Sequence, residues 1–109
     1  MDLGLQGKRV LVTGGASGLG AQLSRTLVAA GAKVAINYRS REGEAQALVS
    51  DLSAENAVAI RADLSVRSEV NDLFDRAVSA FGGLDILVNN AGLWLTCKIG
   101  EITDEDWDR

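Results

Sequence analysis

Short apolar segments alternate along this chain with longer amphipathic ones. The short segments are rich in β-branched residues and predict buried strands at residues 8–12, 33–38, 57–61 and 84–89. The longer segments predict helices at residues 21–30, at about 43–52, and from a cap at Ser65 or Ser68 to about residue 81. A further helix is expected to begin near Thr103. The order is therefore β-α-β-α-β-α-β, with a helix to follow.

The spacing of apolar residues predicts which helix faces point inward. In the first helix, Leu19, Leu23 and Leu27 are expected on one face, and Gly31 is placed to end the helix. The third helix is expected to end at Gly82 and Gly83. The inward residues predicted for the other two helices are Ala45, Leu48, Val49, Leu52, Val70, Leu73, Phe74, Ala77, Val78 and Phe81.

Strands that alternate with amphipathic helices predict an α/β fold with a parallel sheet and right-handed crossovers. We expect a Rossmann-type, doubly wound, three-layer α/β/α arrangement with strand order 3-2-1-4. In such a sheet, ligands bind beyond the carboxyl ends of the strands, where the order reverses between the first and fourth strands. A glycine-rich turn and several polar residues occur at these ends, which makes them the candidate site.

The glycine-rich turn joins the first strand to the first helix, with the sequence Thr-Gly-Gly-Ala-Ser-Gly-Leu-Gly at residues 13–20. A helix N-terminus has unpaired N–H groups and a partial positive charge, so it attracts an anion such as a diphosphate. Gly14 would make the turn, Gly18 would allow close approach of the ligand, and Gly20 would let the helix pack on the sheet. The spacing is neither G-x-G-x-x-G nor that of a Walker loop. The alternative is a turn that only connects a strand to a helix.

Composition narrows the possible functions. The chain has 109 residues, a formal net charge of −4, no histidine and one cysteine, Cys97. No basic stripe is visible, which argues against a nucleic-acid partner, and a His/Cys metal site is not expected. No apolar run approaches the ~18 residues of a membrane span, and no signal-peptide pattern occurs at the N-terminus. A lone cysteine fits a reducing compartment, so we expect a cytoplasmic location.

Three motifs occur in a specific order. Residues 13–20 match T-G-x-x-x-G-x-G, Asp63 and Leu64 match an acidic position after a third strand, and residues 89–92 match N-N-A-G. In this order and spacing the motifs resemble the classical short-chain dehydrogenase/reductase family, in its ketoacyl-reductase-like group, and the resemblance covers the whole chain. It implies hydride transfer between a nicotinamide dinucleotide and a small carbonyl or alcohol substrate.

The resemblance also implies where the cofactor binds. Asp63 and Leu64 would hold the adenine, with the carboxylate accepting a hydrogen bond from its exocyclic amine. Asn90 and Thr13 would tie the fourth strand to the glycine-rich turn. Taken singly, Asp63 could instead be a turn cap, and Asn90 an ordinary turn residue. The residues expected beside the pyrophosphate and adenosine ribose are Gly14, Ser17, Gly18 and Leu19, and those expected beside the nicotinamide-side ribose are Asn90, Ala91 and Gly92.

The end of the second strand bears on the choice between NADP and NAD. An NAD site has an acid there, which would repel the 2′-phosphate of NADP. Here the strand is followed by Arg39, Ser40 and Arg41. A guanidinium binds phosphate through charge-assisted hydrogen bonds, so Arg39 and Ser40 favour NADP. NAD stays the alternative, because Arg39 can be a solvated loop charge and NADP-preferring relatives often have Arg or Lys at the position of Ser17.

The family's catalytic Ser, Tyr and Lys, with Y-x-x-x-K spacing, are not found. The only tyrosine is Tyr38, and Glu42 lies four positions after it. Residues 1–109 are therefore expected to be the N-terminal, NAD(P)-binding half of a reductase, inactive alone. The alternative is a non-catalytic dinucleotide-binding or assembly module. The fourth strand would be an open apolar edge, so we expect self-association into a homo-oligomer or poor stability.

Overall fold

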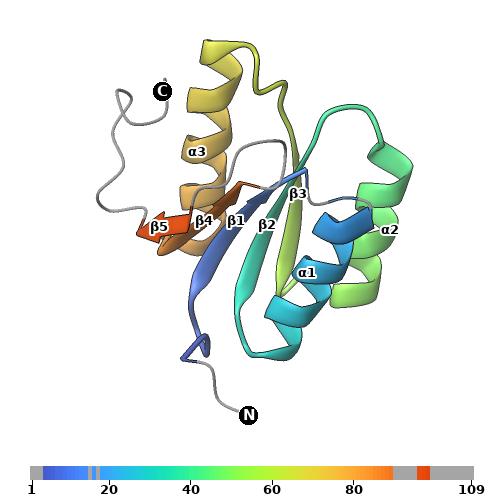
Figure 1. The fold of residues 1–109 in the computed structure, drawn as a ribbon, viewed down its shortest axis with the longest axis vertical. Helices are drawn as coiled ribbons and strands as arrows, with labels where there is room; N and C mark the ends of the chain where they lie inside the picture. The colour runs from blue at the N-terminus through green and yellow to red at the C-terminus, as the bar shows by residue number, and fades with distance from the viewer. Residues whose placement is uncertain (1–3, 15, 17, 90–95, 99–109) are drawn as a thin grey trace.

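The computed structural model describes residues 4–14, 16, 18–89 and 96–98, which form one mixed sheet with helices on both faces (Figure 1). The strand order is β3-β2-β1-β4-β5. The first four of these strands are parallel, and β5 is antiparallel to β4. The predicted order 3-2-1-4 is confirmed. The elements are β1 (Arg9–Thr13), α1 (Gly18–Ala29), β2 (Lys33–Tyr38), α2 (Glu42–Leu52), β3 (Ala57–Arg61), α3 (Arg67–Phe81), β4 (Ile86–Asn89) and β5 (Thr96–Lys98).

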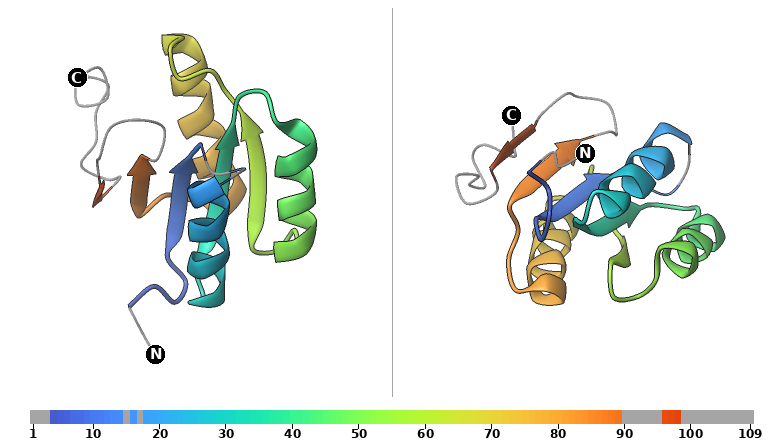
Figure 2. Two further views of the ribbon diagram at one scale, coloured as in Figure 1. Left: turned by 45° about the vertical axis from the view of Figure 1, so that its right-hand side comes forward. Right: turned by 90° about the horizontal axis from the view of Figure 1, so that it is seen from below.

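The three predicted layers are present in the described part of the chain. The helices α1 and α2 lie on one face of the sheet, and α3 lies on the other (Figure 2). Successive residues of a strand point to opposite faces, so β1 contributes to two separate cores. Val10 packs with Ile36 beneath α1 and α2, whereas Leu11 packs with Leu87 beneath α3.

Glycines in the left-handed conformation end two helices, as the sequence predicts. After α1, Gly31 has a φ of 95°, and its N–H donates to the Val28 carbonyl at 2.9 Å. After α3, Gly82 has a φ of 79°, and its N–H donates to the Val78 carbonyl at 2.7 Å. The N–H group of each glycine donates to a carbonyl in the last turn of its helix, and the left-handed conformation turns the chain back toward the next strand.

Two of the predicted inward side chains point outward. Leu19 is 69% exposed, because α1 begins at Gly18 and a separation of eight residues places Leu19 about 80° around the helix from buried Leu27. Val78 is 40% exposed, because it lies about 100° around α3 from buried Ala77. The remaining inward predictions for α2 and α3 are confirmed as buried or as packed against the two cores.

The predicted serine cap of α3 is wrong. Val66 occupies the N-cap position and makes no side-chain capping bond. Ser65 lies one residue before the N-cap, and its hydroxyl donates to Asp63 at 2.7 Å. Ser68 is exposed within the first turn of the helix.

The fourth strand is not an open edge. It begins at Ile86, two residues later than predicted, and its backbone pairs with β5, with Leu87 opposite Cys97. A strand of the same chain therefore covers the edge on which self-association was expected. Self-association stays a prediction, without that support. The expected helix start at Thr103 lies outside the described residues.

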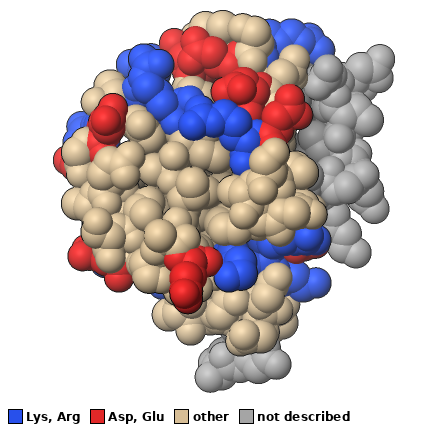
Figure 3. Space-filling view, turned by 180° about the vertical axis from the view of Figure 1, so that it is seen from behind, with Lys and Arg blue, Asp and Glu red and all other residues tan. Residues whose placement is uncertain are grey.

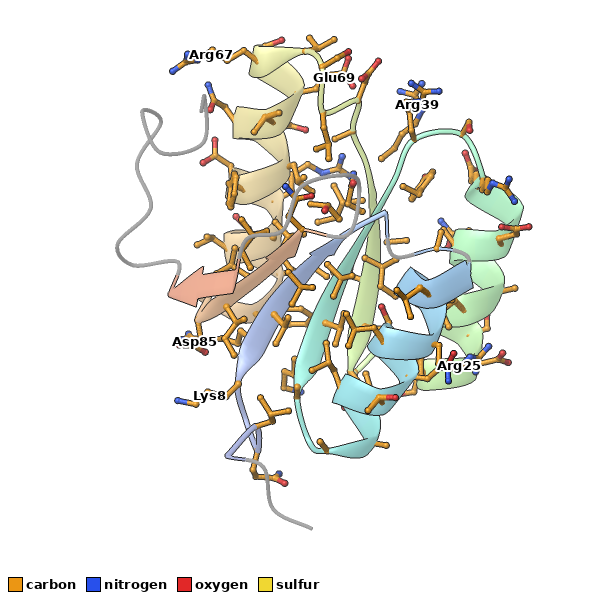
Figure 4. All side chains as sticks on the ribbon, in the orientation of Figure 1. Lys8, Arg25, Arg39, Arg67, Glu69 and Asp85 are labelled. Atoms are coloured by element: carbon orange, nitrogen blue, oxygen red, sulfur yellow. The ribbon has the colours of Figure 1, made fainter. Side chains whose placement is uncertain are left out.

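An ion pair joins the amino ends of β1 and β4, at the edge opposite the candidate site (Figure 4). The Arg9 Nε donates to Asp85 Oδ2 at 2.9 Å, and Nη2 donates to Oδ1 at 3.0 Å. The Arg9 backbone N–H also donates to Oδ2, at 2.9 Å. These hydrogen bonds lower the pKa of the Asp85 carboxyl to about 2.

We expect Asp85→Asn to lower the melting temperature at neutral pH by several degrees. We also expect the melting temperature of this variant to change less as the pH is lowered. Because the pKa of Asp85 is lower in the folded chain, its carboxylate stabilises the fold above about pH 4. That stabilisation is lost as the pH falls toward about 2. Circular dichroism melts across this range measure the effect. Asp51→Asn breaks an exposed ion pair with Arg25 and is the control, with little change expected. Equal melts for Asp85→Asn and the unchanged chain at neutral pH would contradict the prediction.

Candidate functional site

The glycine-rich turn emerges at the carboxyl end of β1, at the point where the strand order reverses. Gly14 and Gly18 have φ values of 61° and 58°, which glycine adopts at little cost. A Cβ on Gly18 would meet no atom within 4 Å, so this residue borders open space. Gly20 is buried one residue after exposed Leu19, at the start of α1. The turn therefore presents backbone to solvent at a helix N-terminus.

Hydrogen bonds hold the end of β1 on both sides. Toward β4, the Thr13 hydroxyl donates to Asn89 Oδ1 at 2.9 Å. Toward β2, the Gly14 N–H donates to Asn37 Oδ1 at 3.2 Å. Thr13 therefore ties the turn to the fourth strand, as expected, and Asn89 is its partner. Asn90, the partner that the sequence favours, lies outside the described residues.

Asn37 is a site residue that sequence reasoning missed. Its side chain is 3% exposed, and besides accepting from Gly14 it donates through Nδ2 to the Ala62 carbonyl at 3.2 Å. Longer contacts of 3.4 Å join Nδ2 to the carbonyls of Ile60 and Tyr38. The available signal was a polar residue in the interior of a mostly apolar strand, since a buried amide needs partners.

A hollow of about 190 Å³ opens beside the turn. The arginines lining it differ in their contacts. Arg41 contacts the Glu44 carboxylate at 3.3 Å, whereas no described carboxylate forms an ion pair with Arg39. Arg39 projects from the carboxyl edge of the sheet (Figure 4). An anion in this hollow would meet at least one guanidinium. The lining residues are Gly14, Ala16, Asn37, Tyr38, Arg39, Ser40 and Arg41.

Asp63 follows β3 at the same edge and forms a tight turn. Its Oδ1 accepts hydrogen bonds from the hydroxyl of Ser65 at 2.7 Å and from the Ser65 backbone N–H at 2.9 Å. The Asp63 N–H donates to Glu69 Oε1 at 2.9 Å. The bonds from Ser65 lower the pKa of the Asp63 carboxyl, and the positive charges of Arg39 and Arg61 add to this effect. Asp63 is therefore an ionised acceptor, and it is also the turn cap that the sequence left as an alternative.

The structure brings together only part of the predicted site. Gly14, Arg39 and Ser40 line one hollow, and Asp63 lies close enough for Arg39 to affect its pKa. Leu64 is half-buried and packs against the core beneath α3. Four predicted residues lie outside the described part of the chain, namely Ser17, Asn90, Ala91 and Gly92.

Acidic and basic side chains occur together on the surface of the molecule. On the face turned away in Figure 1, basic side chains are interspersed with acidic ones (Figure 3). Among the described residues, no group of three His, Cys, Asp or Glu side chains could hold a metal ion. None of the described helices is both long enough and apolar enough to cross a bilayer.

Comparison with known proteins gives consistent matches. The family model described as short chain dehydrogenase matches residues 8–109. The chain is 40% identical over 107 residues to the short chain dehydrogenase mdpC of Emericella nidulans, which covers 96% of this chain. Among solved structures, a short chain dehydrogenase from Burkholderia cenocepacia in complex with NADP has a TM-score of 0.76 and 47% identity over 94% of this chain. A blue fluorescent protein from a metagenomic library, in complex with NADPH, has a TM-score of 0.76 and 42% identity, also over 94% of this chain.

The relatives are longer than this chain. It spans 40% of the Emericella protein, 42% of the Burkholderia chain and 43% of the metagenomic one. The matched region is the N-terminal part of these homologues.

Proposed function

Since the chain belongs to the short-chain dehydrogenase family, we propose that it binds NADP(H) as part of an oxidoreductase that acts on a small carbonyl or alcohol. The observation that carries the proposal is the hollow that joins the glycine-rich turn at Gly14 to Arg39 and Ser40 beyond β2. A diphosphate at the turn and a 2′-phosphate at Arg39 would occupy its two ends. Two similar structures that contain NADP or NADPH support the choice of cofactor, with NAD as the alternative.

Each predicted residue has a place in this proposal. Gly18 and Leu19, with Gly14 and Ser17, would border the diphosphate, where backbone N–H groups and the start of α1 favour an anion. Asp63 and Leu64 would hold the adenine, since an ionised carboxylate accepts a hydrogen bond from an amine. The nicotinamide-side ribose is assigned to Asn90, Ala91 and Gly92. The bound cofactor would supply or accept the hydride, and this chain's own residues bind and orient it.

We further propose that residues 1–109 act as the NAD(P)-binding half and do not transfer hydride alone. The sequence has no Y-x-x-x-K spacing, because Glu42 lies four residues after Tyr38. The same observation favours a second candidate, a non-catalytic dinucleotide-binding or assembly module. Homo-oligomer formation and a cytoplasmic location belong to the proposal as well. Hydride transfer by the purified chain, followed as NADPH oxidation with small ketones, would contradict the expected inactivity.

We expect Arg39→Ala to weaken NADPH binding about tenfold while leaving NADH binding nearly unchanged, because only NADPH carries the 2′-phosphate. Calorimetric titration of the chain with each dinucleotide measures both affinities. Arg76→Ala removes the same charge from an exposed position on α3 and is the control, with no preference lost. Equal weakening of NADPH and NADH by Arg39→Ala would contradict the 2′-phosphate assignment. Absence of binding to the unchanged chain would overturn the proposed function.

A further inference from the structure

We propose that Asn37 is a positioning residue that sets the glycine-rich turn and the adenine-binding strand end at the spacing the cofactor needs. This inference rests on the proposed binding of NADP(H). Asn37 lines the hollow, and its two polar atoms reach toward the two halves of the proposed site. Oδ1 accepts from Gly14 at 3.2 Å, and Nδ2 donates to Ala62 at 3.2 Å. Ala62 immediately precedes Asp63, the residue assigned to the adenine.

The geometry makes this amide a rigid connector. Asn37 sits in β2, between β1 and β3, so a single side chain joins segments that are far apart in sequence. Its side chain is 3% exposed, so water does not compete for these hydrogen bonds. A planar amide with an acceptor on one branch and a donor on the other fits one orientation only. The distance between the diphosphate turn and the Asp63 turn therefore depends on Asn37.

The competing explanation is that Asn37 only stabilises the fold. The substitution Asn37→Asp distinguishes positioning of the cofactor site from stabilisation of the fold. A protonated carboxyl offers one acceptor and one donor, as the amide does, whereas an ionised carboxylate offers acceptors only. Ionised, it would face the carbonyl oxygens of Ala62 and Ile60 with no donor. Burial at this position would raise the pKa of the new carboxyl well above its ordinary value. The Asn37→Asp chain should therefore behave like the unchanged chain in acid and like a disrupted chain in base. If Asn37 only stabilised the fold, the NADPH affinity of the folded variant would not change with the protonation of the new carboxyl.

The test must allow for the charged side chains near this position. Arg39 and Arg41 line the same hollow, and Arg61 and Asp63 lie at the end of β3. The 2′-phosphate of the cofactor also titrates near pH 6. Dividing each variant's NADPH affinity by that of the unchanged chain at the same pH removes these shared effects.

The experiment is calorimetric titration with NADPH from about pH 5.5 to about pH 8.5, on chains shown by circular dichroism to be folded at the measuring temperature. We expect Asn37→Leu, which has a similar volume and no polar atoms, to bind about tenfold more weakly at every pH. We expect Asn37→Asp to lie within about threefold of the unchanged chain in acid and to fall about tenfold below it in base. Asn71→Asp, on an exposed position of α3, is the control, and its affinity ratio should be flat.

Three results would overturn the inference. A folded Asn37→Leu chain that binds NADPH as the unchanged chain does would show that the connector is not needed. A ratio for Asn37→Asp that stays close to one across the pH range would do the same, and this result remains decisive if Asn37→Leu does not fold. Failure of the unchanged chain to bind NADPH would overturn the inference together with the proposed function, which sets that outcome apart from the first two.

Discussion

Gly18→Ala should weaken NADPH binding about a hundredfold while leaving the chain folded. Gly18 has a φ of 58°, and an added Cβ would meet no atom within 4 Å. The methyl group therefore causes no clash within the chain, and its cost to folding is the left-handed conformation, about 1 kcal/mol. In the proposed complex the same methyl group would occupy space that the diphosphate needs for its approach to the backbone.

Gly7→Ala is the control that separates backbone strain from obstruction of the cofactor by the added methyl group. Gly7 has a φ of 74°, and a Cβ there also meets nothing within 4 Å. It precedes β1, at the edge of the sheet away from the hollow. We expect both variants to lose a similar amount of stability in thermal melts, and only Gly18→Ala to lose NADPH affinity in titrations. If the two variants bind NADPH equally well, the turn does not approach the cofactor at Gly18.

Local sequence signals predicted the elements that depend on local chemistry. The bounds predicted for β2 and β3 match those of the structure, because each is a short, mostly apolar segment between polar turns. The strand β4 begins later than predicted because the side chain of Asp85 binds Arg9, accepting from the Arg9 backbone N–H and from its guanidinium. Arg9 lies on the adjacent strand but 76 residues away in sequence, so a pattern of neighbouring residues gives no sign of it.

The same distinction applies to the candidate site. The position of the glycine-rich turn could be predicted, since glycine spacing and a following helix are local features. The role of Asn37 could not, because its partners Gly14 and Ala62 come together only when β1 and β3 flank β2. The spacing suits Ser65 for a helix cap, yet Val66 occupies the N-cap position and the Ser65 hydroxyl donates to the ionised carboxylate of Asp63. Spacing alone therefore does not identify the residue at which the helix begins.

Leu11→Ala should lower the free energy of unfolding by about 3 kcal/mol, a large share of the roughly 5–15 kcal/mol typical of a domain. Leu11 is fully buried on the central strand and packs with Leu73 and Leu87 beneath α3. Removing its methyl groups forfeits their burial and leaves a cavity that the flanking strands cannot close, because both pair with β1 along its length.

Leu19→Ala is the matched substitution at the residue that the sequence placed on the inward face. Leu19 is 69% exposed, so we expect its unfolding free energy to change by less than about 0.5 kcal/mol. Urea unfolding monitored by circular dichroism measures both variants. Similar losses would mean that Leu19 is buried after all and that α1 is rotated from its position here. A large loss at Leu11 alone would show that the body of β1 determines stability. Leu19, at the start of α1, would then contribute little to stability.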